Sequence, residues 1–245
     1  MPATRAVGLT VLVLVVAGCA STPSPSVPSS PAASTTQPSA APTASGAPSP
    51  APSASAPAGP LELPSGTAAL PAGTYTRAGF RPPITFAIED GWFPGTVTDG
   101  FFDIQQERGT PDVIAVQVAR PTHVVGAGGA AAPATTAAAA VEAIRDNPAI
   151  TVIDESPSRL GGLDGQTVVV ENRGASTAGI MDVAPGRLSI DPRRRLWISL
   201  FDTPDGVVGV MVGGSVARWA DALRLAEPVL ESVVIGGSPA ASPSS

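Results

Sequence analysis

A long uncharged segment limits which parts of this chain can fold. From Ala20 to Pro60 almost every residue is Pro, Ala, Ser or Thr, and none carries a charge. Such a composition cannot bury enough apolar surface to offset the entropy lost on ordering. We therefore expect residues 19–60 to form a disordered linker, which at about 3.1 Å per residue in polyproline II would reach on the order of 100 Å. A plain spacer and an O-glycosylated stalk both fit this composition.

Residues 1–18 have the parts of a secretory signal peptide. Arg5 precedes an apolar run from Ala6 to Ala17, and small residues follow at a candidate cleavage point. The run has about a dozen residues, whereas a membrane-spanning helix needs roughly 20. We therefore expect this segment to be removed rather than to remain as a transmembrane anchor.

Cys19 is the only cysteine and directly follows Val16-Ala17-Gly18. This spacing resembles a bacterial lipobox, although leucine is commoner at the position of Val16. The resemblance implies cleavage before Cys19 and linkage of its thiol to diacylglycerol. Two acyl chains hold a protein stably at a membrane, where one binds marginally. The expected location is the extracytoplasmic face of the bacterial cell membrane, with the lipid on Cys19 as the membrane contact.

The charge balance narrows the classes of function. The chain has 20 acidic residues and 14 basic ones, every one of them arginine, for a net charge of −6. This acidity argues against a general nucleic-acid binder, which needs a basic field. A single cysteine excludes an intramolecular disulfide and a cysteine-based zinc site. We expect no metal and no cofactor.

Between the linker and a similar uncharged tail at residues 236–245 lies one predicted domain, residues 61–235. Its size suits a single core. Apolar residues alternate at residues 84–88, 101–107, 113–119, 195–201 and 207–212, which predicts strands of an antiparallel sheet. In residues 195–201 both faces are largely apolar, so this strand should lie inside the sheet. Asp205-Gly206 predicts the hairpin turn that follows.

Two helices are predicted beside these strands. Thr135 or Thr136 can cap an alanine-rich helix that runs to about Asn147, before Pro148. A second helix should begin near Val216 with Ser215 as its cap, and Pro228 should restart or kink it. Its predicted apolar stripe consists of Val216, Trp219, Leu223 and Ala226. The fold class is therefore α+β.

The order of these segments resembles PsbP-like lipoproteins of the LpqN type. The shared features are Asp90-Gly91-Trp92 after an apolar strand, the Leu160–Gly165 turn, and Glu231-Ser232-Val233 at the end of the last helix. The resemblance implies a twisted antiparallel sheet flanked by two main helices, and noncatalytic binding roles. It supplies no catalytic residues.

Catalytic patterns are sparse. His123 is the only histidine, so any Ser-His-Asp triad or histidine-metal site would need it. No Gly-x-Ser-x-Gly elbow is present, and we expect His123 to be exposed. The glycine-rich residues 126–131 formally fit a dinucleotide fingerprint but lack its strand-helix context. We expect that the chain is not an enzyme, with a hydrolase as the least favoured alternative.

Two groups of residues are candidates for binding. Arg193, Arg194 and Arg195 form a basic cluster that suits an anionic headgroup or a phosphate, or else a solvated strand entrance. Trp92 and Phe93 suit the rim of a pocket or a partner surface, or else core packing. The first functional hypothesis is a module that binds an envelope protein. The alternative is a carrier or sensor of a lipid or other apolar small molecule, which needs a hollow between the sheet and the alanine-rich helix.

Substitution of Cys19 by Ala tests the anchor. The variant should be released from the membrane or persist as an uncleaved precursor, because it lacks the thiol that would carry the lipid. Fractionation of cells and the mass of the purified protein measure both effects, with Ser21→Ala as the control outside the lipobox. Normal maturation together with membrane retention of Cys19→Ala would exclude the lipobox interpretation.

Overall fold

The computed structural model describes residues 59–184 and 186–236. The predicted signal peptide, lipobox, Cys19, linker and tail lie outside the described residues, apart from Gly59, Pro60 and Gly236 at their edges. Among the described residues, no helix is both long enough and apolar enough to cross a membrane.

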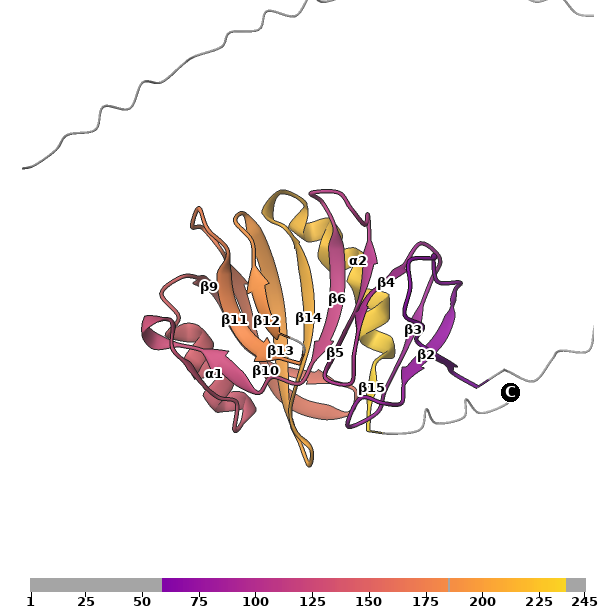
Figure 1. Ribbon diagram of the computed structural model, residues 1–245, viewed down its shortest axis with the longest axis horizontal. Coiled ribbons are helices and arrows are strands. Elements are labelled where there is room, and N and C mark those ends of the chain that lie inside the picture. Colours follow the sequence, from indigo (N-terminus) through magenta and orange to yellow (C-terminus); the bar gives the residue numbers. More distant parts are fainter. Residues whose placement is uncertain (1–58, 185, 237–245) are drawn as a thin grey trace, which may run out of the picture. The chain divides into compact units, whose positions relative to one another are not determined.

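A seven-stranded antiparallel sheet forms the centre of the fold (Figure 1). In spatial order its strands are β4 (Phe93–Val97), β5 (Phe101–Gln106), β6 (Ile114–Ala119), β14 (Gly206–Ser215), β13 (Arg194–Thr203), β10 (Leu163–Glu171) and β9 (Thr151–Leu160). The strands predicted for residues 101–107, 113–119, 195–201 and 207–212 are confirmed, with shifts of a few residues at their ends. The predicted hairpin turn joins β13 and β14, shifted by one residue so that Pro204 and Asp205 form the turn and Gly206 begins β14.

Strand β13 lies inside the sheet and contributes to both of its faces, as its sequence predicts. Leu196, Ile198 and Leu200 belong to one hydrophobic cluster, and Phe201 belongs to the other. The first cluster also contains helix α1 (Ala137–Arg145), and the second contains helix α2 (Trp219–Ser232). The sheet is therefore covered on both faces, and we call these faces the α1 side and the α2 side.

Two small sheets share this covering with the helices. The first contains β1 (Leu61–Glu62), β2 (Gly73–Arg77), β3 (Ile84–Ile88) and β15 (Val234–Ile235), and the second contains β12 (Gly186–Ile190), β11 (Ala178–Val183), β7 (His123–Val125) and β8 (Ala131–Pro133). Phe86 of the first packs on the α2 side, and Ile180 of the second packs on the α1 side. The expectation of one sheet flanked by two helices is thus correct only in part. The fold is α+β but sheet-rich, because a single helix is too narrow to cover seven strands.

Helix α1 has the predicted cap and end. The Thr136 hydroxyl accepts a hydrogen bond from the Ala139 N–H (3.1 Å), which satisfies a backbone donor of the first turn. The helix ends at Arg145, shortly before Pro148. Its buried residues are Ala137, Ala140, Val141 and Ile144.

Helix α2 differs from the prediction at its start, along its face and at Pro228. A 3-10 turn, η2 (Val216–Arg218), precedes it, and the Ser215 hydroxyl bonds to Asp112 instead of capping the helix. Ala226 of the predicted stripe is buried, together with Ala222 and Val229. The other members of the stripe, Val216, Trp219 and Leu223, are only half-buried. A single helix continues through Pro228, which is exposed. The solvent side of a curved helix has longer hydrogen bonds, so the missing proline N–H is tolerated there.

The carboxyl group of Asp103 on β5 is buried, with 3% of the residue exposed. It accepts hydrogen bonds from the Thr96 N–H (2.7 Å) and from the Gln105 amide. Strand β4 shifts register between Pro94 and Val97, and the carboxyl group lies against this irregularity. Burial raises the pKa of Asp103 above its ordinary value, despite the hydrogen bonds that lower it.

Asp103→Asn should therefore stabilise the fold at neutral pH, because the amide retains the acceptor for Thr96 without a buried charge. A carboxyl group whose pKa is raised by folding lowers the free energy of unfolding as pH rises. This loss begins near the pKa of the unfolded state, about 3.9, and is complete above the raised pKa of the folded state. The advantage of the variant in the free energy of unfolding should grow through this window and then stay constant. Urea unfolding between pH 4 and 7.5 measures it, and a difference that does not vary with pH would contradict this explanation.

Candidate binding groove

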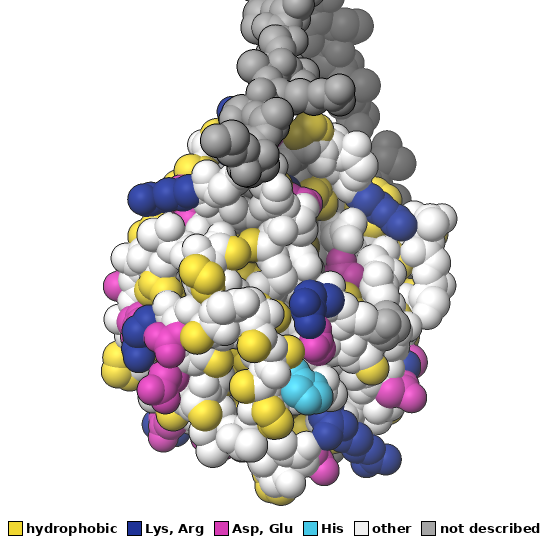
Figure 2. Space-filling model, turned by 60° about the vertical axis from the view of Figure 1, so that its left-hand side comes forward, with side chains coloured by type: hydrophobic (Ala, Val, Ile, Leu, Met, Phe, Trp, Pro, Cys, Tyr) yellow, Lys and Arg dark blue, Asp and Glu magenta, His cyan; other side chains and the backbone are white. Residues whose placement is uncertain are grey.

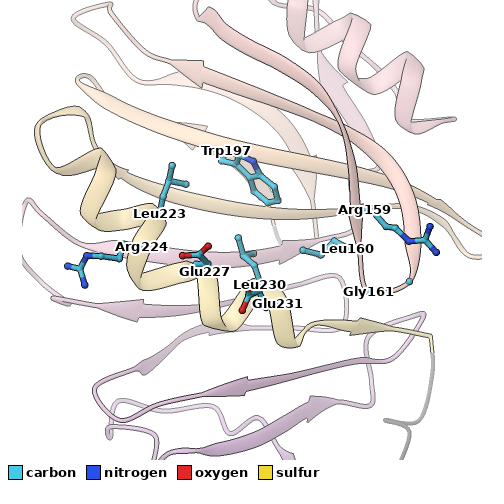
Figure 3. Close-up of a pocket in the computed structure, with 10 residues that line it drawn as sticks. Arg159, Leu160, Gly161, Trp197, Leu223, Arg224, Glu227, Leu230 and Glu231 are labelled. Carbon is cyan, nitrogen blue, oxygen red and sulfur yellow. The ribbon is translucent and has the colours of Figure 1, made fainter.

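Unequal covering of the α2 side leaves part of the central sheet open. Helix α2 packs against β3, β6 and β14. On the same face, β9 and β10 extend beyond the helix and carry the half-buried Val169 and the exposed Ser156. The result is a groove of about 590 Å³ between α2 and the β9–β10 hairpin (Figure 3). We call it the α2 groove.

The floor and walls of the α2 groove are apolar. Trp197 projects from β13 toward α2, and Leu223 and Leu230 project from the helix (Figure 3). Leu160 completes this lining from the β9–β10 hairpin. All four side chains are half-buried and pack on the edge of the α2-side core. A volume of this size lies within the range of ordinary ligand and peptide sites.

Charges of both signs surround this apolar strip. Arg159 stands on the hairpin, whereas Arg224, Glu227 and Glu231 stand on α2 (Figure 3). Arg224 pairs with Asp221 at 3.2 Å. Within the described residues, Glu227 and Glu231 form no ion pair that would neutralise them. The rim therefore offers both acceptors and donors to a bound molecule.

Gly161 closes one end of the groove. Its carbonyl accepts a hydrogen bond from the Ile235 N–H (3.5 Å), and it bridges to Val234 beyond the end of α2. Its φ of 60° lies in the left-handed region that favours glycine. A Cβ at this position would lie 2.7 Å from Cγ1 of Ile235. Glycine is thus needed both for the turn and for the close approach of the two segments.

The predicted aromatic pair does not form an exposed surface. Trp92 is 2% exposed and belongs to the α2-side core, which agrees with the alternative prediction that it packs in the core. Phe93 is half-buried at the start of β4. The tryptophan at the groove is instead Trp197, whose strand pattern had suggested a central core position.

His123 is exposed at the start of β7, as expected (Figure 2). Within the described residues its ring has one hydrogen-bond contact, from Nδ1 to the Thr122 hydroxyl at 3.3 Å. Asp182 is its partner in the β7–β11 pairing, but that carboxylate binds Arg187 at 2.6 Å. These contacts do not bring a serine to the imidazole, so they do not favour the hydrolase alternative.

The three predicted arginines have three different environments. Arg193 is exposed, with a left-handed backbone of φ 61°. Arg194 donates hydrogen bonds to the carbonyls of Pro111 (3.2 Å) and Val113 (2.6 Å), and burial lowers its pKa. Arg195 binds Glu171 at 2.6 Å. The cluster therefore does not act as one basic patch.

Glu171 is the acidic partner of this region. Arg195 faces it across the β10–β13 pair, and Arg173 binds its other oxygen at 3.1 Å. The hydrogen bond from Arg195 is the main cause that holds the pKa of Glu171 below its ordinary value. The Arg195 guanidinium also lies 5.6 Å from the ring centroid of Trp219, a distance typical of cation–π contacts.

The hollow that an apolar carrier would need beneath the alanine-rich helix is filled in the described structure. Ala140, Val141 and Ile144 of α1 pack directly with Val168 and Ile198 of the sheet. Each of these five residues is at most 2% exposed. The space beneath α1 is core, and the α2 groove lies on the opposite face of the sheet.

Comparison with known proteins gives a likeness in structure alone. No family model matches the chain, and no curated protein matches it in sequence. The solution structure of cyanobacterial PsbP (CyanoP) from Synechocystis sp. PCC 6803 is 11% identical, with a TM-score of 0.40 over 71% of this chain and 98% of that one. LpqN of Mycobacterium tuberculosis, described as involved in cell envelope biogenesis, is 10% identical, with a TM-score of 0.36 over 72% and 88%.

A crystal structure from Bacteroides thetaiotaomicron VPI-5482 is 8% identical, with a TM-score of 0.32. It aligns over 65% of this chain and 47% of its own. The described fold thus has a weak likeness to PsbP and LpqN. At these scores the likeness concerns only the general outline of the fold.

Gly161→Ala and Gly162→Ala form a matched pair that tests how the groove is closed. Both positions have positive φ, but only at Gly161 does a Cβ meet another segment. Gly162→Ala should cost about 1 kcal/mol from backbone strain. Gly161→Ala should cost about 2–4 kcal/mol, because overpacking against Ile235 adds to that strain. Urea unfolding measures both free energies of unfolding, and equal losses would show that the hairpin does not pack tightly against Ile235 of β15.

Proposed function

We propose that this chain is a lipid-anchored extracytoplasmic protein of the bacterial cell envelope, whose globular part is a noncatalytic module that binds a protein partner through the α2 groove. The observation that carries the binding role is the half-buried strip of Trp197, Leu223, Leu230 and Leu160. The signal-peptide and lipobox patterns that end at Cys19 support the location.

The form of the groove favours a protein over a lipid. The recess is open to solvent along α2, so a bound acyl chain would remain partly in water. A protein partner is large enough to cover the apolar strip and exclude water from it. Aromatic anchors with leucine neighbours are typical of the central contacts in protein interfaces. The rim carries both arginine and glutamate, which suits a partner with charges of both signs.

Elsewhere on the described surface, few large apolar side chains are strongly exposed. Among the described residues these are Leu61 (52% exposed) and Ile153 (40%), which belong to different sheets. On the face shown in Figure 2, apolar side chains are interspersed with polar ones, and acidic and basic side chains lie side by side. Scattered exposed residues of this kind are normal on soluble domains and need no partner.

Leu223→Glu tests the groove, with Ile153→Glu as the matched control at an exposed position on β9. The full-length protein is crosslinked mildly in cells, purified, and compared with both variants. We expect a reproducible protein partner whose capture falls at least about tenfold in Leu223→Glu, because a central apolar contact is replaced by a charge, and is unchanged in Ile153→Glu. The thermal midpoints of both variants verify that they remain folded.

Two results would contradict this proposal. One is that a folded Leu223→Glu variant captures the partner protein as well as the wild type does. The other is a stoichiometric lipid that copurifies with the wild type, is seen by native mass spectrometry and is lost in Leu223→Glu. That second result would instead establish the carrier of an apolar small molecule.

A further inference from the structure

A second recess of about 850 Å³ lies at the entrance of β13, beside the first residues of η2. Its walls include apolar residues, among them Pro111, Val113 and Val216. Three arginines line it, namely Arg173, Arg193 and Arg194. We call it the arginine pocket. It is distinct from the α2 groove, with which it shares no lining residue.

The backbone at Arg193 forms a bulge of a kind that normally contains glycine. The Arg193 N–H donates to the Asn172 carbonyl (3.0 Å), and the Asn172 N–H donates to the Arg194 carbonyl (3.1 Å). Two residues of one strand thus oppose one residue of the other, and the first of the two is left-handed, with φ 61°. This is the pattern of a G1 bulge, whose first residue is typically glycine. An arginine here strains the backbone where glycine would not.

Nothing in the described fold uses the side chain that carries this strain. The Arg193 guanidinium has no hydrogen bond or ion pair with another described residue, while its backbone carbonyl accepts from the Val216 N–H (3.0 Å). The bulge itself would form with glycine. Strained residues that the fold does not need are typical of functional positions.

Arg173 adds a second donor group to the pocket. Its Nε binds Glu171, but its terminal nitrogens have no hydrogen-bond partner among the described residues. Its neighbour Asn172 is paired with the Arg193–Arg194 bulge, so Arg173 and Arg193 extend from adjacent strand ends.

The carboxylates of the pocket each accept a hydrogen bond from another side chain. Glu171 accepts from Arg195 and Arg173, Asp112 accepts from the Ser215 hydroxyl (3.1 Å), and Asp191 accepts from the Thr177 hydroxyl (2.9 Å). Arg194 is likewise committed to two carbonyls. The unused donors are therefore those of Arg193 and the terminal nitrogens of Arg173.

We infer that the arginine pocket binds a phosphate-type oxyanion between Arg193 and Arg173, with the apolar wall available to a carbon chain attached to it. Two guanidinium groups together offer more donors than a carboxylate can accept, whereas a phosphate monoester presents three terminal oxygens. The oxyanion is either free phosphate or the headgroup of an anionic lipid. This inference does not depend on the protein partner proposed for the α2 groove.

Arg193→Gly separates the role of the side chain from that of the fold. The thermal midpoint of the full-length protein should stay the same or rise by about 2 °C, because glycine relieves the left-handed strain. The affinity for inorganic phosphate, measured by isothermal titration calorimetry at low salt, should fall at least about tenfold, as expected for a lost charge-assisted interaction. Arg193→Lys should lose a large part of the affinity, since lysine lacks the planar fork.

Arg145→Ala is the matched control, because it removes an exposed arginine on α1 that lines neither the arginine pocket nor the α2 groove. It should leave phosphate binding unchanged. Dihexanoyl phosphatidic acid and dihexanoyl phosphatidylcholine identify the source of the oxyanion. If dihexanoyl phosphatidic acid binds about tenfold more tightly than inorganic phosphate, the oxyanion is a lipid headgroup, and equal affinities for these two ligands indicate the free anion. Either result supports the site, provided that Arg193→Gly weakens the binding.

Two outcomes overturn the inference. The first is the absence of saturable binding of both inorganic phosphate and dihexanoyl phosphatidic acid to the wild type. The second is wild-type affinity in a folded Arg193→Gly variant. A clear fall in the thermal midpoint of Arg193→Gly would show that the arginine serves the fold, which removes the argument from strain.

Discussion

Burial of both faces of β13 and β14 is the constraint on which the rest of the structure depends. Ile198 and Met211 face the α1 side, whereas Phe201 and Val212 face the α2 side, and none of the four is exposed. Each face therefore needs a second layer. The chain supplies one helix and one small sheet for each face. On the α2 side this cover ends before β10 and β9, and the α2 groove lies at that boundary.

Local signals in the sequence predicted the elements whose cause is local. Alternation in residues 195–201, the Asp205-Gly206 turn and the Thr136 cap each depend on residues close together in the chain. The division into three sheets was not predictable in this way. β7 pairs with β11 and β3 with β15, and these pairings join segments far apart in sequence. Alternation identifies a strand but not its neighbours.

The sequence does not predict the α2 groove, because its lining comes from segments that are far apart in the chain. Trp197 and Leu223 have the spacing of core residues, and only the limited width of α2 leaves them half-buried. The arginine cluster was found, because three consecutive basic residues are visible in any sequence. The sequence does not show that these three arginines have different partners, because Glu171 and the Pro111 carbonyl come from other strands and loops. Left-handed φ at Arg193 has no sequence signal, because glycine rather than arginine marks such positions.

The pair of Glu171 and Arg195 explains how two recesses can coexist on one pair of strands. Along β13, Trp197 belongs to the α2 groove and Arg194 to the arginine pocket, and Arg195 stands between them, against Trp219. Its charge is matched by Glu171 at 2.6 Å, with side-chain exposures of 22% and 11%. A partly buried pair of this kind is held more firmly than an exposed one. Because Arg195 is neutralised there and Arg173 shares Glu171, the guanidinium of the pocket without a partner among the described residues is that of Arg193. The apolar strip of Trp197 and Leu223 therefore remains free of this charge.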